Sequence, residues 1–498
     1  MKEIIHRSTC EADTLRLGAD ISLLLMPGDC LALSGDLGAG KSVFARGLIR
    51  QLLQNQEEDI ASPTYTICNV YDTTPRIAHI DLYRFAGREE LDELDIDEIL
   101  ETGCALIEWP ERGFEQLPEN FVHVVISEAG DRERKLRFSG NESFLCRINR
   151  TLRIRDFLNA NGYPGVQRRH LEGDASARRY ERIVADNDLE WLLMDAPEMP
   201  DGPPVRDGKP YSQIAHLAEN VSAFVAIAKI LRDKHMSAPE IPGMDLDAGL
   251  LLVENLGDGK IIDQNRIPVE GRYLASVEFL ANLHTHDFPP SVPISEGIKY
   301  VIPAYDNDAL SIETELLIDW YIPEIIDQPL EPQKLREFFQ IWNDLFSELK
   351  AQEKTLVLRD FHSPNIIWRG DKAGVDRIGV IDFQDAVIGP IAYDVASLAQ
   401  DARVDVSEVL EKKLVETYLE LRLVGNPHFD KEKFKAGYAI MAAQRATKIL
   451  GIFCRLNKRD GKPQYLAHIP RISDYLQRSL RHPVLERYRN WLNTVIEL

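Results

Sequence analysis

Residues 35–42 read Gly35-Asp36-Leu37-Gly38-Ala39-Gly40-Lys41-Ser42, which satisfies the pattern G-x-x-x-x-G-K-[ST]. A short apolar run at 31–33 precedes this stretch, and a segment with helical spacing of apolar residues follows it from residue 43. Glycines in such a loop let successive backbone N–H groups surround phosphate oxygens at the start of a helix. The stretch therefore predicts a strand, a nucleotide-binding loop and a helix, in which Lys41 contacts the β and γ phosphates of ATP and Ser42 binds Mg²⁺.

Two acidic residues follow apolar segments further along the chain. Asp81 lies near the end of the predicted strand 77–82, and Glu108 ends the predicted strand 105–108; a third strand is expected at 121–127. A P-loop requires an acidic group near a strand end to hold the metal or to orient the attacking water. Asp81 and Glu108 are the two candidates, and the alternation of strands and helices indicates an α/β sheet domain.

These motifs resemble one family, the TsaE ATPase of the bacterial machinery that attaches threonylcarbamoyl to tRNA adenosine. The resemblance runs through 35–47, 62–66, 79–84 and 105–112. It implies that Thr64 lies in a switch-like loop near the γ-phosphate, that Glu108 serves the metal or the water, and that Trp109 packs beside the nucleotide. It also implies partners, the other subunits of the threonylcarbamoyladenosine complex.

Length and charge limit the remaining possibilities. The chain has 498 residues, a formal net charge of -22 and a pI near 5.1. A strongly acidic chain repels a phosphate backbone, so contact with tRNA is expected only through partners. The six cysteines lack paired spacing, and neither a signal peptide nor a 20-residue apolar run occurs. We therefore expect a cytoplasmic protein without a membrane span, built of two domains at about 1–145 and 150–498.

A second catalytic motif occurs near residue 360. Asp360 and Asn365 form the pattern D-x-x-x-x-N, and Asp382 follows the apolar residues 378–381. Phosphoryl transfer to a hydroxyl needs a carboxylate that accepts the proton and oxygen ligands that hold magnesium. Asp360 is the predicted base, whereas Asn365 and Asp382 are the predicted magnesium ligands. Apolar strands at 366–368 and 378–381 would form the hairpin between them.

The order of predicted elements indicates a kinase-like fold. After a helix at 152–160 come strands at 179–185 and 191–194, a long helix at 211–235 and a buried strand at 250–253. The remainder reads as mainly helical apart from the hairpin around residue 370. A small β-rich lobe followed by a helical lobe is the outline of a bilobal protein-kinase-like domain.

These segments resemble the aminoglycoside phosphotransferase superfamily, whose members phosphorylate small molecules. The resemblance continues through 389–398, where Asp394 should brace the catalytic loop, and through 252–258, where Glu254 and Leu256 should meet adenine. The sequence departs from the superfamily in two places. Leu358 replaces a frequent histidine, and no lysine lies between residues 135 and 209 to bind the α and β phosphates.

The missing lysine is accounted for by a resemblance to one branch of that superfamily. Residues 173–180, 194–197, 444–453 and 455–462 resemble the cell-wall-recycling kinases that phosphorylate N-acetylmuramate and N-acetylglucosamine at the anomeric position. In this branch Arg178 and Arg179 would replace the lysine. An amino sugar is then the expected small-molecule substrate, and a muramate carboxylate needs one cation, for which the candidates are Arg445, Lys448 and Arg455.

Two alternatives remain at this level. The second domain could phosphorylate an aminoglycoside or choline instead, or it could be a pseudokinase that binds nucleotide and regulates its neighbour. The sequence His284-Thr285-His286-Asp287 could suggest a metal site, but its place at a predicted helix end favours capping, and no zinc is expected.

Overall fold

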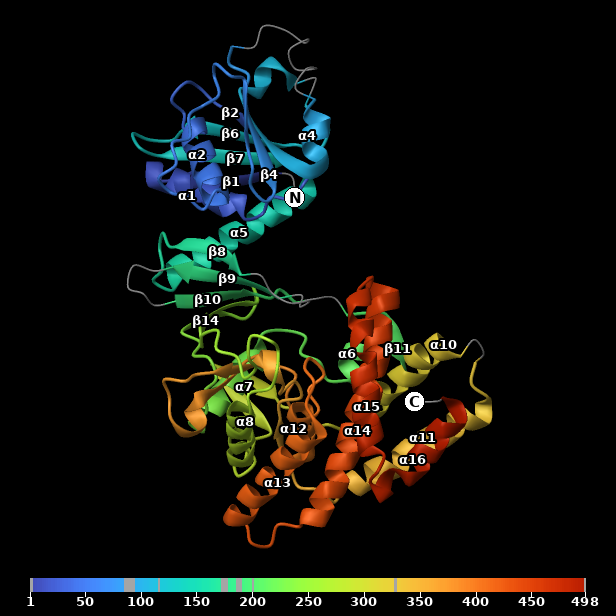
Figure 1. The fold of residues 1–498 in the computed structure, drawn as a ribbon. Coiled ribbons are helices and arrows are strands. Elements are labelled where there is room, and N and C mark those ends of the chain that lie inside the picture. Colours follow the sequence, from blue (N-terminus) through green and yellow to red (C-terminus); the bar gives the residue numbers. More distant parts are fainter. Residues whose placement is uncertain are drawn as a thin grey trace. The chain divides into compact units, whose positions relative to one another are not determined.

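A computed structural model describes residues 3–84, 95–114, 117–171, 178–184, 190–198, 201–326 and 329–496. The chain divides into two compact units, Met1–Leu193 and Met194–Leu498 (Figure 1). Within the described ranges, every helix is too short or too polar to cross a bilayer.

A seven-stranded sheet forms the centre of the first unit. Its order is β1-β7-β6-β2-β5-β4-β3, and the four strands β6, β2, β5 and β4 are parallel. The remaining pairs are antiparallel. The strands are β1 Glu3–Ser8, β2 Cys30–Ser34, β3 Cys68–Tyr71, β4 Arg76–Asp81, β5 Gly103–Glu108, β6 Val122–Glu128 and β7 Arg134–Gly140. The three strands predicted at 77–82, 105–108 and 121–127 are therefore confirmed, with ends shifted by one or two residues.

The sheet is buried on both faces, as parallel strands require. In β2, Leu31 and Leu33 join the core under helices α1 Glu11–Ser22, α2 Lys41–Leu52 and α5 Glu142–Ala160. Cys30 and Ala32 point to the opposite core, which α4 Ile96–Thr102 covers. Figure 1 shows α1 and α2 on one side of the sheet and α4 on the other.

Helices α1 and α2 cross at close range because glycines lie at the contact. A Cβ added to Gly18 would lie 2.3 Å from the Phe44 carbonyl oxygen, and one added to Gly47 would lie 2.0 Å from the Leu15 carbonyl oxygen. Only residues without a side chain permit this separation. The orientation of α2, and hence of the P-loop before it, depends on this packing.

The segment after the sheet differs from the prediction. The predicted helix at 152–160 begins ten residues earlier, at Glu142, because the Asn141 side chain accepts a hydrogen bond from the Phe144 N–H and caps α5. Phe144 and Ile148 of α5 pack into the core of the first unit. Strands β8 Gln167–Leu171 and β9 Arg179–Val184 form an antiparallel hairpin, and β10 Glu190–Asp195 follows. The sequence prediction missed β8, whose buried side chain is Arg168 and not an apolar residue.

The second unit is mainly helical, with short antiparallel strand pairs. The pairs are β11 Pro204–Arg206 with β12 Lys209–Pro210, β13 Gly243–Asp245 with β14 Leu250–Glu254, β15 Ser291–Ser295 with β16 Ile298–Val301, β17 Lys354–Val357 with β20 Val387–Pro390, and β18 Ile366–Trp368 with β19 Ile378–Val380. The helices are α6 Tyr211–Ile214, α7 Ser222–Asp233, α8 Glu270–Leu283, α9 Asn307–Leu316, α10 Ile322–Ile325, α11 Pro332–Leu349, α12 Ala392–Ala399, α13 Glu408–Gly425, α14 Lys431–Asp460, α15 Ile469–Ser479 and α16 Glu486–Val495. The 30-residue helix α14 packs against α9, α12 and α15.

The predicted hairpin at 366–381 is present, but the single helix predicted at 211–235 is wrong. It is interrupted between α6 and α7, where His216 has a φ of 53°. The carbonyl of Ala215 accepts a hydrogen bond from Arg359, and the N–H of Ala218 donates to Asp385. The Ala215 carbonyl and the Ala218 N–H are thus paired with the side chains of Arg359 and Asp385, so they are not available for the hydrogen bonds of a continuous helix. The pairs β15–β16 and β17–β20 were also not predicted.

The close crossing of α1 and α2 yields a test. Gly47→Ala should lower the free energy of unfolding by about 1–3 kcal/mol, because the added methyl group must displace the backbone of Leu15. Urea denaturation measures this change. Gly130→Ala in the same unit is the matched control, since its Cβ would meet nothing closer than the Glu133 side chain at 3.4 Å. Equal stabilities of the two variants would contradict this account of the crossing.

Candidate functional site

The P-loop lies between β2 and α2, and its glycines adopt backbone angles that other residues avoid. Gly35, Gly38 and Gly40 have φ values of 148°, 81° and 109°. A Cβ on Gly35 would also lie 2.3 Å from the Ile126 carbonyl oxygen. A cavity of about 290 Å³ opens at this loop. It is lined by Leu37, Gly38, Gly40, Lys41, Ser42, Val43, Ser62, Thr64, Asp81, Tyr83, Glu108 and Trp109.

Lys41, the first residue of α2, lies folded over the loop. Its Nζ donates to the carbonyl oxygens of Gly35 at 2.6 Å and Asp36 at 3.0 Å. The same atom lies 3.6 Å from the centre of the Trp109 ring, close enough for a cation–π contact. Burial lowers the pKa of Lys41, and Glu108 partly opposes that shift. A phosphate in the cavity would supply the ammonium with a stronger partner than two carbonyl groups.

The two acidic candidates lie side by side at the carboxyl edge of the sheet. The parallel register of β4 and β5 pairs Asp81 with Glu108. Ser42 Oγ donates to Glu108 Oε2 at 3.1 Å, and Asp81 Oδ2 accepts from Thr64 Oγ1 at 2.7 Å. The structure thus brings Ser42, Thr64 and both carboxylates into one cavity, as the sequence predicted.

Two neighbours of these carboxylates were not singled out from the sequence. His79 Nε2 lies 2.9 Å from Glu108 Oε1 in the buried interior, and Ser62 Oγ donates to Asp81 Oδ2 at 2.6 Å. The alternation of side chains along a strand could have indicated His79, because residues two apart in β4 share one face of the sheet and Asp81 was already a candidate. Ser62 lies two residues before Thr64, the same spacing that separates His79 from Asp81.

The second set of candidates lies in the second unit, on the segment around β18 and β19. Asn365 Nδ2 donates to the Asp360 carbonyl oxygen at 3.0 Å and lies 3.4 Å from Asp382 Oδ2. The Ile381 N–H donates to the Asn365 carbonyl oxygen at 3.0 Å. Asp382 itself has a φ of 58°, which turns its side chain at the end of the strand. The structure therefore brings Asp360, Asn365 and Asp382 together.

Asp394 fixes the backbone before the predicted base. It is fully buried, and its carboxylate accepts hydrogen bonds from the N–H groups of Leu358 at 2.7 Å and Arg359 at 3.0 Å. Burial raises the pKa of Asp394 to about 7, whereas the two N–H donors favour the ionised form. This is the bracing contact that the resemblance implied.

A buried ionic cluster holds the Arg359 side chain. Glu313 of α9 has no exposed surface and binds the guanidinium of Arg359, and it also accepts from Lys448 Nζ at 2.8 Å. Gln444 and the Tyr305 hydroxyl donate to its other oxygen. Burial alone would raise the pKa of Glu313, but Lys448 and Arg359 outweigh it and lower this pKa to about 2. The cluster was not predicted, because its members are far apart in the sequence.

The remaining residues that the sequence singled out lie in three separate parts of the structure. Leu256 is buried after β14, and the Glu254 carboxylate at the end of that strand accepts from the Glu240 N–H at 3.1 Å. Arg178 is half-buried and Arg179 exposed at the start of β9, in the first unit; residues 173–177 lie outside the described ranges. His284 is the C-cap residue that follows α8, and its Nδ1 lies 2.7 Å from the Tyr418 hydroxyl. Burial lowers the pKa of His284 to about 3.

The Glu313 cluster yields a test of stability. Glu313→Gln would leave Arg359 and Lys448 buried without a carboxylate, so the free energy of unfolding should fall by about 3–5 kcal/mol at neutral pH. Urea denaturation measures the loss. Glu324→Gln, which breaks an ion pair with Lys458 at the surface, is the matched control and should cost less than about 1 kcal/mol.

Acid should also lower the free energy of unfolding of the wild-type chain, because it protonates Glu313. The pKa of Glu313 in the folded state lies below its ordinary value of 4.5. The stabilisation is therefore complete above about pH 4.5 and is lost as the pH falls toward 2. A Glu313→Gln variant as stable as wild type at pH 7 would show that the ion pairs contribute no net stability.

Two family models match the chain, and each match includes one of the two sets of candidate residues. The family model of threonylcarbamoyl adenosine biosynthesis protein TsaE matches residues 8–136, and that of the phosphotransferase enzyme family matches residues 167–433. These matches confirm the predicted fold class, an α/β P-loop domain followed by a kinase-like domain.

Individual relatives match either the kinase part or the TsaE part of the chain. The chain is 34% identical over 354 residues to the N-acetylmuramate/N-acetylglucosamine kinase of Caulobacter vibrioides, covering 68% of this chain and 95% of the relative. It is 36% identical over 151 residues to the tRNA threonylcarbamoyladenosine biosynthesis protein TsaE of Bacillus subtilis, covering 29% and 93%. The solved ethanolamine kinase of Plasmodium vivax is 14% identical, with a TM-score of 0.46 and coverage of 70% and 92%. The chain belongs to the phosphotransferase enzyme family and carries a TsaE domain fused to the N-terminal side of the kinase.

Proposed function

We propose that this chain is bifunctional. Its N-terminal domain, residues 1–145, hydrolyses ATP for tRNA threonylcarbamoyladenosine modification, and its C-terminal domain, residues 150–498, transfers phosphate from ATP to the anomeric hydroxyl of N-acetylmuramate or N-acetylglucosamine in cell-wall recycling. The observation that carries the kinase assignment is 34% identity along 95% of a relative of that name, with Asp360, Asn365 and Asp382 gathered in one place. This support favours an amino-sugar kinase over an aminoglycoside kinase, a choline kinase or a pseudokinase.

The P-loop cavity fits a nucleotide triphosphate. Its three glycines present backbone N–H groups where side chains would obstruct phosphate, and Lys41 supplies the positive charge. Gly35, Asp36, Gly38, Ala39, Gly40 and Lys41 would hold the phosphates. Ser42, Asp81 and Glu108 are the oxygen donors that would hold Mg²⁺, and hard oxygen ligands suit that ion.

The remaining parts of this site have separate tasks. Thr64 would contact the γ-phosphate once its hydroxyl leaves Asp81, and Trp109 would pack beside the nucleotide. Glu108 is the proposed base for the attacking water, and it already lies within hydrogen-bond distance of His79 and Ser42. A histidine beside the carboxylate would fix its orientation.

In the kinase domain Asp360 would accept the proton of the sugar hydroxyl while the hydroxyl oxygen forms a bond to the γ-phosphorus and ADP departs. Asn365 and Asp382 would hold Mg²⁺, which neutralises charge on the phosphates when it is bound. Glu254 and Leu256 would meet the adenine. Arg178 and Arg179 would bind the phosphates in place of the missing lysine.

Among the three candidate cations for a muramate carboxylate, the structure favours Arg455. Lys448 is bound to Glu313, and Arg445 donates to the Gln400 carbonyl oxygen. Arg455 lies with its guanidinium 5.0 Å from the Tyr211 ring centre, and its buried Nε has no hydrogen-bond partner within the described part of the chain. Burial lowers the pKa of Arg455. A carboxylate would give this Nε a charged hydrogen-bond partner, in addition to the interactions of the guanidinium with Tyr211 and Asp460.

The partners follow from the same proposal. The N-terminal domain would act with the other subunits of the threonylcarbamoyladenosine complex and would meet tRNA only through them, because the net charge of -22 opposes direct binding. Work on tRNA would place the chain in the cytoplasm.

Replacing Lys41 tests the first domain. Lys41→Ala should weaken nucleotide binding at the P-loop by about 10- to 100-fold, because a charge-assisted contact to phosphate is lost. ATP hydrolysis in the presence of the partner subunits and titration with a fluorescent ADP analogue both report the loss. Arg7→Ala, on the edge strand β1, is the control and should leave both unchanged. ATPase activity that survives in Lys41→Ala would disprove the assignment.

The acceptor is tested by locating the transferred phosphate. The full chain should convert each amino sugar and ATP to the sugar 1-phosphate, identified by phosphorus–proton NMR correlation. Asp360→Asn should lower turnover by about 100-fold or more. Arg455→Ala should raise the KM for N-acetylmuramate and leave that for N-acetylglucosamine, which lacks the carboxylate, nearly unchanged. Phosphate at the 6-hydroxyl, or transfer to aminoglycosides alone, would reject the proposal.

A further inference from the structure

The boundary between families and the boundary between compact units do not coincide. The phosphotransferase match begins at Gln167, the first residue of β8, whereas the first compact unit continues to Leu193. The β8–β9 hairpin therefore has the sequence of the kinase but packs with the TsaE domain. Specific contacts at the C-terminal half of α5 explain this arrangement.

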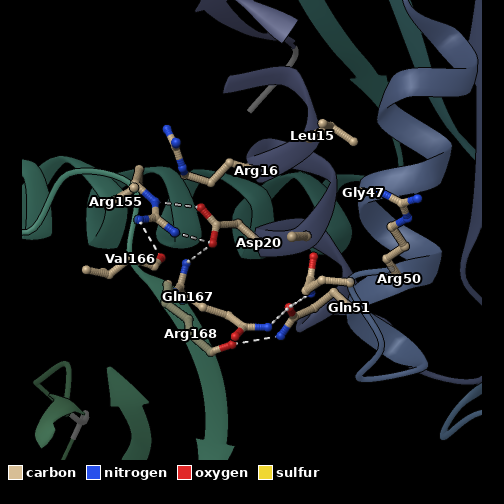
Figure 2. Close-up of a pocket in the computed structure, with 13 residues that line it drawn as sticks. Leu15, Arg16, Asp20, Gly47, Arg50, Gln51, Arg155, Val166, Gln167 and Arg168 are labelled. Atoms are coloured by element: carbon tan, nitrogen blue, oxygen red, sulfur yellow. Dashed lines mark hydrogen bonds and ion pairs between the residues drawn. The ribbon is translucent and has the colours of Figure 1, made fainter. Parts of the chain in front are cut away.

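A chain of buried ion pairs joins the hairpin to helices α1 and α5. Asp20 of α1 accepts two hydrogen bonds from Arg155 of α5, at 2.8 Å and 2.6 Å, and lies 3.4 Å from Arg168 of β8 (Figure 2). Arg168 in turn donates to both oxygens of Glu181 in β9, at 2.7 Å and 2.9 Å. A further donor of Arg168 reaches the Thr151 hydroxyl at 2.7 Å.

These groups are too deeply buried to separate without cost. The side chains of Arg168, Asp20 and Glu181 are 0%, 6% and 6% exposed. Removing one member of such a set leaves an unpaired charge inside the protein, which typically costs about 3–5 kcal/mol. The hairpin is consequently held in one position against the TsaE domain and is not joined to it by a loose linker.

The P-loop helix contacts the same strand from its other end. Lys41 and Ser42 begin α2, and Gln51 lies in its last turn, about 15 Å away at 1.5 Å per residue. Gln51 Nε2 donates to the Arg168 carbonyl oxygen at 2.7 Å, and Gln167 Nε2 donates to Gln51 Oε1 at 3.1 Å. Figure 2 shows the Gln51 and Gln167 side chains close to Asp20 and Arg168.

The junction is not completely filled. A cavity of about 280 Å³ lies between α1, α2 and β8, lined by Leu15, Arg16, Ala19, Asp20, Gly47, Arg50, Gln51, Gln56, Arg155, Gly165, Val166, Gln167 and Arg168. Gly47, Arg50 and Gln51 of α2 face this cavity, whereas Phe44, Leu48 and Ile49 of the same helix are packed in the core. The hydrogen bonds of Gln51 are therefore the direct contacts through which a displacement of the end of α2 would reach β8.

We propose that this junction couples the P-loop to the kinase hairpin, so that nucleotide bound beside Lys41 stabilises β8 and β9 through Gln51. The inference rests on the proposed nucleotide site at the P-loop. Arg179, one of the residues proposed to bind the ATP of the kinase, lies at the start of β9. Coupling of this kind is reciprocal and commonly changes an equilibrium by about 5- to 150-fold.

Hydrogen exchange in the full chain tests the coupling. ADP should slow amide exchange in β8, residues 167–171, by about fivefold or more. The effect should vanish in Lys41→Ala, whose kinase nucleotide residues are unchanged, which identifies the P-loop as its origin. It should also vanish in Gln51→Ala, which keeps the P-loop intact. Arg46→Ala, on the same helix, removes a 3.9 Å ion pair with Glu11; it is the matched control and should behave as wild type.

The possible outcomes separate the two proposals. If a fluorescent ADP analogue binds Lys41→Ala as tightly as wild type, the P-loop assignment fails and the coupling fails with it. If ADP binds the P-loop but exchange in β8 is unchanged, or is still slowed in Gln51→Ala, only the coupling is overturned. Should Gln51→Ala not fold, Gln167→Ala removes the facing amide from the β8 side and should likewise reduce the slowing.

Discussion

A charge buried in protein must have a partner, and this constraint determines how several distant segments of the chain are held. In the first unit Asp20, Arg155, Arg168 and Glu181 satisfy one another across two helices and a hairpin. In the second unit Glu313 does the same for Arg359 and Lys448. Well-packed apolar residues could supply comparable stability, but loss of one member of a buried ion pair leaves an unpaired charge. The ionic clusters therefore set geometry at two places where catalytic segments are anchored.

The anchoring has a direct bearing on phosphoryl transfer. Asp360 follows Arg359, whose backbone N–H is held by Asp394 and whose side chain is held by Glu313. A base fixed from both sides loses little entropy when a hydroxyl approaches it, which is the benefit of preorganisation. The P-loop shows a parallel solution, in which Gly35 and Gly47 allow close backbone contacts on either side of Lys41.

The local candidates that the sequence named for each site lie close together in the structure, and their catalytic and binding roles stay predictions. Motif spacing located the P-loop, Asp81, Glu108, Asp360, Asn365 and Asp382, because each lies within a few residues of a recognisable strand or turn. It could not predict contacts between distant segments. Glu313 and Lys448 are more than 130 residues apart, and β8 lacked an apolar pattern because its inward side chain is an arginine. The break after α6 was missed for the same reason, since the hydrogen bonds that interrupt the helix come from residues 359 and 385.

The position of the β8–β9 hairpin has an evolutionary consequence. Fused genes often yield proteins whose halves can be parted again, since a new linker leaves the older surfaces intact. Here Arg168, which lies in the phosphotransferase match, is buried beside Asp20, which lies in the TsaE match. Separation of the two domains would remove this carboxylate from beside Arg168 and expose groups that are buried together in the fused chain.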